Sequence, residues 1–311
     1  MSTSGAEPNQ PNLLRSLRGL AESAARIGGD LALASFRQPQ KVRLKADHSE
    51  VTDADIAAER AIVDHIRTRR PQDVFIGEES SSDEPDRQSS IINPQSLVWV
   101  IDPIDGTRNY VRNMPMFVCS VGAMREGVPL AGAIYDPVHG AMYSAARKQG
   151  FFVDGLRRPT RRSPATKRRS AAASRRAQTD AASAAQRSGA VADSSERCQL
   201  LIGIPSAQRP TTRQIVLGAV ENHVVRNFGS AALHLAFVAL GHLDAAVMGN
   251  GKLWDIAAGA ILVSEAGGVV TSPDGSALFP IDTSRYAGEE CPILAGSPTA
   301  HARLLREART D

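Results

Sequence analysis

The feature that most constrains this chain is an apolar stretch that ends in two carboxylates. Residues 97–101 read Leu-Val-Trp-Val-Ile, and Asp102, Pro103 and Asp105 follow. An apolar run of this length has strand character, and Pro103 should end regular structure because proline cannot donate a ladder hydrogen bond. Gly106 then permits a positive φ angle. We therefore expect two carboxylates to converge where a buried strand gives way to a turn.

This turn offers further binding groups. The Ile104 carbonyl lies between the two carboxylates and can join them as an oxygen ligand of a hard cation such as Mg²⁺. The amides of Gly106 and Thr107 lie where a helix or a nest would begin, and exposed amides at such a place bind phosphate. An ordinary surface turn is the alternative interpretation.

Apolar spacing elsewhere predicts helices and strands in layers. One amphipathic helix is expected over residues 17–31, where apolar side chains recur at steps of three and four. A second helix is expected over 53–70, and further helices over 229–240 and 254–266. Strands are expected at 73–76, 117–124, 131–135, 141–146, 199–204 and 244–248, and near 269 and 293. The closely spaced strands from 117 to 146 suggest an antiparallel meander. The fold class is therefore α+β or mixed α/β.

Composition indicates a globular protein. The chain has 311 residues, of which 42% are hydrophobic and 22% charged, enough for one large domain or two coupled ones. No run of about 18 apolar residues occurs, and no basic start precedes an apolar core, so we expect neither a membrane span nor a secretory signal. Three widely spaced cysteines argue against a disulfide framework or a zinc site. A cytoplasmic protein is expected.

Charge is distributed unevenly along the chain. Residues 157–197 contain 11 Lys and Arg against 3 Asp and Glu, a balance of +8, whereas the remainder has 25 basic and 30 acidic residues. The segment has no aromatic and almost no large aliphatic residue, so it cannot offset the entropy of ordering. We expect a disordered basic insertion between halves at 13–156 and 198–311, which form one composite domain after a flexible start at 1–12. A nucleic-acid-binding arm is the alternative.

Two further acidic motifs follow predicted elements. Glu78 and Glu79 come directly after the strand at 73–76, and Asp255 lies at the start of the helix at 254–266. Each has a plain structural interpretation as well, a solvated acidic loop for the glutamates and a helix N-cap for Asp255.

In combination these motifs resemble the inositol monophosphatase family, which comprises Mg²⁺-dependent, lithium-sensitive phosphatases of small phosphorylated metabolites. The resemblance is carried by Gly77-Glu78-Glu79-Ser80, Asp102-Pro-Ile-Asp-Gly-Thr107 and Trp254-Asp255-Ile-Ala-Ala-Gly259, in this order. Supporting stretches are Val51-Thr-Asp-Ala-Asp55, Tyr135-Asp-Pro-Val138, Gly150-Phe-Phe-Val-Asp-Gly155 and Glu265-Ala-Gly-Gly268. It covers the chain from about Leu14 to Arg306, apart from the basic insertion, and implies a layered αβαβα sandwich of the inositol monophosphatase and fructose-1,6-bisphosphatase type.

The resemblance implies a magnesium site and a phosphoric monoester hydrolase. The activating Mg²⁺ would be bound by Glu78, Asp102 and the Ile104 carbonyl. A second ion would be held by Asp102, Asp105 and Asp255, and Glu78 would also help to hold a third.

The resemblance also implies the catalytic groups, namely Thr107, Glu78 and Asp55. Thr107 would position the nucleophilic water, and Asp55 would accept the threonine proton. Mg²⁺ lowers the pKa of bound water and neutralises the phosphate, so that in-line attack can proceed. The amides of Gly106 and Thr107 would hold the phosphate oxygens.

The substrate end is less well defined. By resemblance Gly229, Ser230 and Ala231 would face the substrate, and Asp255 would also touch a hydroxyl. Inositol phosphatases carry a glutamate shortly before the Trp-Asp motif, where this chain has Met248, and methionine cannot accept a comparable hydrogen bond. Lys252 could instead meet a second anionic group, or be a solvated loop lysine.

Several functions therefore stay open. Histidinol phosphate, fructose 1,6-bisphosphate and 3′-phosphoadenosine nucleotides are alternative substrates, and a homodimer is expected. The rival from another class is a binding or regulatory protein that contacts nucleic acid through 157–197. The carboxylates favour an enzyme, because a pure binding module has no need to retain clustered charges that repel one another.

Overall fold

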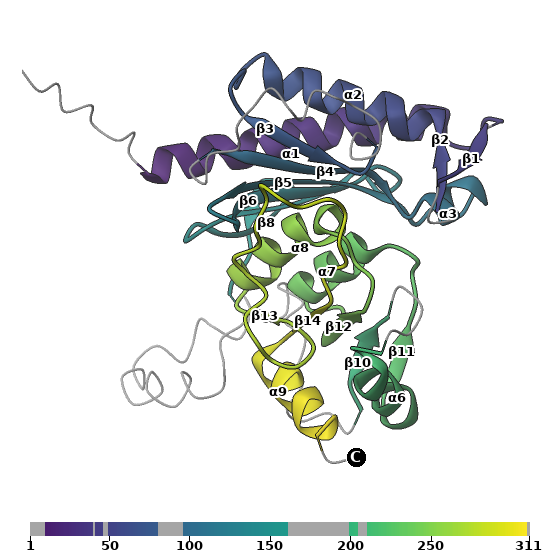
Figure 1. Ribbon diagram of the computed structural model, residues 1–311, viewed down its shortest axis with the longest axis vertical. Helices are drawn as coiled ribbons and strands as arrows, with labels where there is room; N and C mark the ends of the chain where they lie inside the picture. Colours follow the sequence, from purple (N-terminus) through teal and green to yellow (C-terminus); the bar gives the residue numbers. More distant parts are fainter. Residues whose placement is uncertain are drawn as a thin grey trace, which may run out of the picture.

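The computed structural model describes residues 10–39, 41–45, 49–79, 96–160, 199–204 and 210–309. Most of these residues form five layers, in which two large sheets alternate with three pairs of helices (Figure 1). Helices α1 (Gln10–Ser35) and α2 (Asp53–Arg67) cover the outer face of the first sheet. The predicted layered αβαβα class is confirmed.

The first sheet has seven strands in the order β3-β4-β5-β6-β7-β8-β9. Their bounds are Val74–Gly77, Val98–Asp105, Val118–Arg125, Val128–Asp136, Ala141–Ala146, Gly150–Val153 and Leu156–Arg157. Strands β3 and β4 run parallel, and the other neighbours run antiparallel, as the predicted meander requires. The ends of β3 and β4 therefore lie at the same edge of the sheet, which brings Glu78 and Asp102 to that edge.

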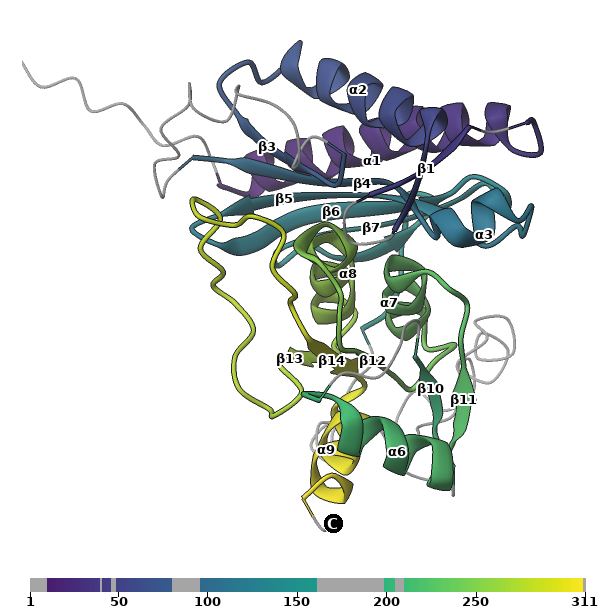
Figure 2. The ribbon, with the colours of Figure 1, turned by 45° about the vertical axis from the view of Figure 1, so that its right-hand side comes forward.

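The second sheet has five strands in the order β11-β10-β12-β14-β13. Their bounds are Val224–Arg226, Leu201–Gly203, Ala245–Met248, Ile293–Gly296 and Val269–Thr271. Helices α7 (Ala231–Leu240) and α8 (Leu253–Glu265) lie between the two sheets, and α6 (Arg213–Asn222) and α9 (Pro298–Glu307) cover the far face (Figure 2). The middle helices are apolar on nearly all sides because both faces are buried.

Strand β4 departs from the prediction at Pro103. We expected regular structure to stop there, but β4 continues to Asp105 through a shift in register against β5 between Asp102 and Asp105. Proline is tolerated at a bulge because its missing amide leaves no ladder bond unmade. The expected turn is therefore a bulged strand end.

Two predicted boundaries also differ from the structure. Helix α1 begins at Gln10, inside the start that was expected to be flexible, and β9 includes Arg157, the first residue of the expected basic insertion. Residues 1–9 and 161–198 lie outside the described ranges. None of the helices in the described part is both long and apolar enough to span a membrane.

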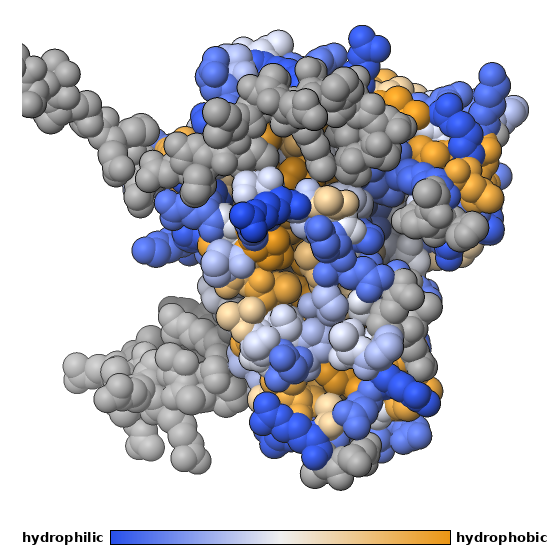
Figure 3. All heavy atoms as spheres, viewed as in Figure 1, coloured by the Kyte–Doolittle hydropathy of each residue, from blue (hydrophilic) through white to orange (hydrophobic). Residues whose placement is uncertain are grey.

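The sequence patterns did not predict a small hairpin of β1 (Val42–Leu44) and β2 (Glu50–Thr52), which lies beside the short helix α3 (Thr107–Val111). Hydrophobic side chains gather on the surface near this hairpin (Figure 3), where Val42 and Leu44 are exposed. The hairpin matters for the site because Lys45 follows β1.

Candidate active site

The bulged end of β4 carries Asp102 and Asp105, both buried. Asp102 Oδ1 accepts a hydrogen bond from the Ile104 amide at 3.0 Å, so the bulge folds back on its own carboxylate. Gly106 follows with a φ of +105°, and a Cβ there would lie 2.9 Å from the Met116 carbonyl oxygen. Only glycine meets both demands. The sequence reasons for expecting glycine here hold in the structure.

Thr107 begins α3 and lies next to Asp55. Its hydroxyl is 3.0 Å from the Ile104 carbonyl oxygen and 3.3 Å from Asp55 Oδ1. Asp55 lies in the first turn of α2, where Oδ2 accepts the Thr52 amide at 2.8 Å and the Thr52 hydroxyl at 2.5 Å. Burial raises the pKa of Asp55 to about 6, although the Thr52 bonds lower it. The structure thus brings Asp55, Thr107 and the Ile104 carbonyl together.

Glu78 and Glu79 share a cation that sequence analysis missed. The Lys45 ammonium lies 2.8 Å from Glu78 Oε1 and 2.8 Å from Glu79 Oε1. Burial alone would lower the pKa of Lys45, but the two carboxylates raise it above its ordinary value. Burial, followed by the charge of Glu78, raises the pKa of Glu79 to about 8. The acidic pair is therefore part of an ion-pair cluster and not a freely solvated loop.

Glu59 is a second residue that sequence analysis missed. It lies on α2, is only 4% exposed, and its Oε2 accepts the Glu79 amide at 2.9 Å. A Cβ at Gly77 would collide with this carboxylate, so glycine at that position makes room for it. A glutamate on the inner face of an amphipathic helix is the signal that could have identified it.

Asp105 is held by the N-terminus of α7. The Ser230 hydroxyl donates to Asp105 Oδ2 at 2.8 Å, the Ala231 amide donates to Oδ1 at 3.2 Å, and the Ala232 amide also donates to Oδ2. Burial raises the pKa of Asp105 to about 6 against the opposing effect of these donors. Ser230 and Ala231, expected to face the substrate, here bind a carboxylate of the chain itself, and Gly229 lies beside Asn109.

Asp255 lies in the first turn of α8. Its Oδ2 accepts the Lys252 amide at 2.7 Å, so Lys252 is the N-cap and Asp255 stands three residues later. The interpretation of Asp255 as the N-cap itself is wrong, because the helix begins two residues before it. The Lys252 ammonium donates to the Gly288 carbonyl at 2.5 Å. Met248, at the end of β12, is buried in the core between the sheets.

The carboxylates of these elements act on one another electrostatically. Burial, then the charges of Glu78 and Asp105, raise the pKa of Asp102 well above its ordinary value. Burial, then Asp105 and Glu78, do the same for Asp255, which also shares a hydrogen bond with Asp102. Three buried aspartates from β4 and α8 thus lie close enough to Glu78, which follows β3, for the charges of Glu78 and Asp105 to raise the pKa of Asp102 and of Asp255.

The donor set has the chemistry of a magnesium site. Within the described ranges, however, no three His, Cys, Asp or Glu side chains are arranged to hold a metal ion. Protein donors hold the carboxylates instead, namely Lys45 on Glu78, the α7 amides on Asp105 and the Lys252 amide on Asp255. All the candidate ligands are hard oxygen atoms, and a dication would relieve their mutual repulsion. The residues therefore fit Mg²⁺. On binding the ion, Glu78 would exchange its contact with the Lys45 ammonium for one with the metal.

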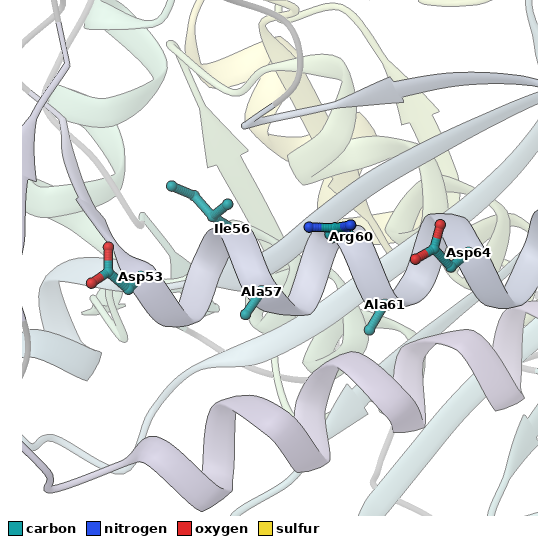
Figure 4. A pocket seen from close by; sticks show the side chains of 6 residues that line it. All are labelled: Asp53, Ile56, Ala57, Arg60, Ala61 and Asp64. Carbon is teal, nitrogen blue, oxygen red and sulfur yellow. The ribbon is translucent and has the colours of Figure 1, made fainter.

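A hollow of about 420 Å³ lies along the outer face of α2, away from these carboxylates. It is lined by Asp53, Ile56, Ala57, Arg60, Ala61 and Asp64 (Figure 4). None of the site residues lines it, because Asp55 points to the buried side of the same helix.

A model of the inositol monophosphatase family matches residues 13–310. This chain belongs to the inositol monophosphatase family. It is 30% identical over 298 residues to the protein named Nus factor SuhB of Escherichia coli (strain K12), covering 94% of this chain and 95% of the relative. It is 29% identical to inositol monophosphatase 1 of Solanum lycopersicum, covering 88% and 90%.

A solved structure also shares this fold. The inositol monophosphatase from Anabaena (Nostoc) sp. PCC 7120 superposes with a TM-score of 0.70 at 28% identity, covering 96% of this chain and 97% of that one. The family predicted from the acidic motifs is therefore confirmed. The relatives include proteins named for phosphatase activity and others named as a Nus factor.

Proposed function

We propose that this protein is a Mg²⁺-dependent phosphomonoesterase that hydrolyses a small phosphorylated metabolite. The observation that carries the proposal is the meeting of Asp102, Asp105, Asp255 and Glu78 in one region, where the charges of Glu78 and Asp105 raise the pKa of Asp102 and of Asp255. Membership of the inositol monophosphatase family supports it. A cluster of buried carboxylates is costly unless a cation compensates it.

The proposed ligands of Mg²⁺ are Glu78, Asp102, the Ile104 carbonyl, Asp105 and Asp255. When bound, Mg²⁺ would neutralise the phosphate and lower the pKa of a water molecule.

Thr107 and Asp55 would handle the proton of that water. The threonine hydroxyl can donate to Asp55 Oδ1, which leaves its oxygen free to accept a hydrogen bond from the attacking water. Asp55 keeps this orientation because Thr52 occupies its other oxygen. The amides of Gly106 and Thr107, at the start of α3, would hold the phosphate oxygens.

The proposed substrate is a small phosphorylated metabolite, and we expect no specialisation of the enzyme for inositol 1-phosphate. Met248 supplies no charged acceptor for a ring hydroxyl, and a missing hydrogen bond to a charged group lowers specificity by about tenfold to a hundredfold. Gly229, Ser230, Ala231, Asp255 and Lys252 are the proposed substrate contacts. If the Lys252 ammonium turns from Gly288 to the substrate, substrates with a second anionic group would be favoured.

A phosphatase panel tests both levels of this proposal. Phosphate release from inositol 1-phosphate, histidinol phosphate, fructose 1,6-bisphosphate and 3′-phosphoadenosine 5′-phosphate would be measured with Mg²⁺, with excess EDTA and with Li⁺. We expect hydrolysis that EDTA abolishes and Li⁺ inhibits, without preference for inositol 1-phosphate. Full turnover in EDTA would contradict the metal role, and a specificity constant highest for inositol 1-phosphate would contradict the argument from Met248.

A second candidate function is a regulatory role in transcription. For either function we propose a cytoplasmic homodimer. The regulatory role is favoured by the 30% identity to Nus factor SuhB and by the balance of +8 over residues 157–197. Positive charge without interleaved aromatic residues would give salt-dependent, sequence-independent binding of nucleic acid. Filter binding at two salt concentrations, with and without the segment, tests this role, and light scattering tests the dimer.

A further inference from the structure

Three consecutive residues before the Trp-Asp motif are held by one distant segment, residues 286–291, which we name the strap. The Cys291 amide donates to the Gly251 carbonyl at 2.6 Å, and the Lys252 ammonium donates to the Gly288 carbonyl at 2.5 Å. The Leu253 amide donates to the Tyr286 hydroxyl at 2.7 Å. No residue between 251 and 253 is therefore free to move without breaking a bond to the strap.

The Tyr286 hydroxyl provides a hydrogen-bond acceptor for a backbone amide at the start of α8. A helix begins with amides that lack a partner inside the helix, and an N-cap side chain usually accepts from them. Here the N-cap is Lys252, whose ammonium has no acceptor. The Tyr286 hydroxyl accepts from the first helical amide instead, while it donates its own proton to the Glu289 carbonyl at 2.8 Å.

The strap is itself anchored on two sides. The Tyr286 ring packs edge-on against Trp254, with centroids 5.9 Å apart, and Tyr286 is only 6% exposed. Earlier in the same β13–β14 connection, the Ile281 amide donates to the Gly127 carbonyl at 3.0 Å, in the turn between β5 and β6. The connection thus runs from the second sheet beside α8 to the first sheet (Figure 2). The β13–β14 connection therefore links the start of α8 to both sheets.

The orientation of Asp255 depends on the same three residues. Its Oδ2 accepts the Lys252 amide at 2.7 Å, and that amide is flanked by the two backbone groups that the strap holds. A shift of this turn would rotate the carboxylate and move Oδ1 relative to Asp102 and Asp105.

We infer that Tyr286 is a positioning residue, whose hydroxyl orients the first turn of α8 so that Asp255 can serve as a Mg²⁺ ligand. The inference deepens the proposed function and rests on it. Tyr286 does not touch the carboxylate itself, so its influence passes through Leu253 and Lys252.

The test is Mg²⁺ binding to Tyr286→Phe, measured by isothermal titration calorimetry on the full chain, beside the kcat and KM of phosphate release. Phenylalanine keeps the ring on Trp254 and removes only the hydroxyl. Tyr135→Phe is the matched control, because the Tyr135 hydroxyl bonds to Asp30 of α1 and not to α8. We expect binding of Mg²⁺ to weaken about fivefold in Tyr286→Phe, the equivalent of one hydrogen bond, and less than twofold in the control.

Lys252→Met is a second variant, which breaks the bond to Gly288 and leaves Tyr286 in place. It should also weaken Mg²⁺ binding, and it serves if Tyr286→Phe does not fold. Equal Mg²⁺ affinity in Tyr286→Phe and in the wild type, with only the melting temperature changed, would overturn the inference alone. A wild-type chain that neither binds Mg²⁺ nor releases phosphate would overturn the proposed function and the inference together.

Discussion

Helices α7 and α8 both begin at the candidate site, but their first turns are built in different ways. Ser230 caps α7 from within, since its hydroxyl oxygen accepts the Leu233 amide at 3.2 Å. The side chain of Lys252, the N-cap of α8, cannot accept a hydrogen bond from the helix, and Tyr286 supplies the missing acceptor from 33 residues away. The α7 start is therefore a local structure, whereas the α8 start exists only when a distant loop has folded against it.

The first turns of α7 and α8 also differ in the number of hydrogen bonds that they donate to a carboxylate. Asp105 receives three donors from the positive end of α7, which is where a helix stabilises an anion. Asp255 receives a single amide from its own helix and lies among other carboxylates that raise its pKa. The protein itself compensates the charge of Asp105, whereas Asp255 depends more on a cation. This difference leads to four predictions.

The largest expected effect is on turnover in Asp102→Asn, Asp105→Asn and Asp255→Asn. Each should lower kcat by about 100-fold or more, because each removes a charge that stabilises the reacting phosphate through the metal. The melting temperature should distinguish two of these variants. Asp105→Asn should lower the melting temperature, since an amide group would face the α7 donors, while Asp255→Asn should not, since it relieves repulsion. Near wild-type turnover in any variant would place the metal site elsewhere.

A smaller effect is expected when the local cap is removed. Ser230→Ala should cost about 1 kcal/mol of stability as a lost N-cap, and should also lower turnover because Asp105 loses a donor. Ser297→Ala is the matched control, since Ser297 caps α9 by accepting the Ala300 amide at 3.2 Å. Urea unfolding should show similar losses for both, and phosphate release should fall only in Ser230→Ala. Equal activities would mean that the α7 cap is purely structural.

A third test extends the comparison to the opposite side of the site, through pH. Burial raises the pKa of Asp55 from 3.8 to about 6, and burial with Glu78 raises that of Glu79 from 4.5 to about 8. Between the ordinary and the raised values the folded state binds more protons than the unfolded state, so the free energy of unfolding falls as pH rises. In EDTA, stability should therefore decrease from pH 5 to pH 8.

Glu79→Gln should flatten this decrease, and Mg²⁺ should oppose it at pH 8 by compensating the neighbouring charges. Urea titrations at three pH values measure the slope. An unchanged slope in Glu79→Gln would show that Lys45 keeps Glu79 ionised throughout this range.

The smallest effect is expected from changing the basic segment. Replacing residues 161–195 with a short Gly-Ser linker should change kcat less than twofold, because the segment carries Ala, Ser and Arg where a core needs Leu, Ile or Phe. Brief proteolysis of the native protein should cut within this segment first. A loss of hydrolysis in the replaced chain would show that the segment contributes to the site.

Much of the site could be predicted from short stretches of sequence. The Glu78 motif, the turn from Asp102 to Thr107 and the start of α8 each depend on neighbours within a few residues. Order and spacing of these stretches also predicted the family and the layered fold. Pro103 misled the prediction because a bulge, which depends on the neighbouring strand β5, accommodates it.

Only the tertiary structure decided which partner each carboxylate takes. Lys45 and Glu78 are 33 residues apart, and Ser230 and Asp105 are 125 apart. Tyr286 reaches Leu253 across 33 residues. Periodicity and propensity report on contacts within a turn or a strand, whereas these hydrogen bonds arise where separate layers meet. The sequence by itself thus determined which acidic groups gather at the strand ends, and the packing of α7, the strap and the β1–β2 hairpin determined how each is held.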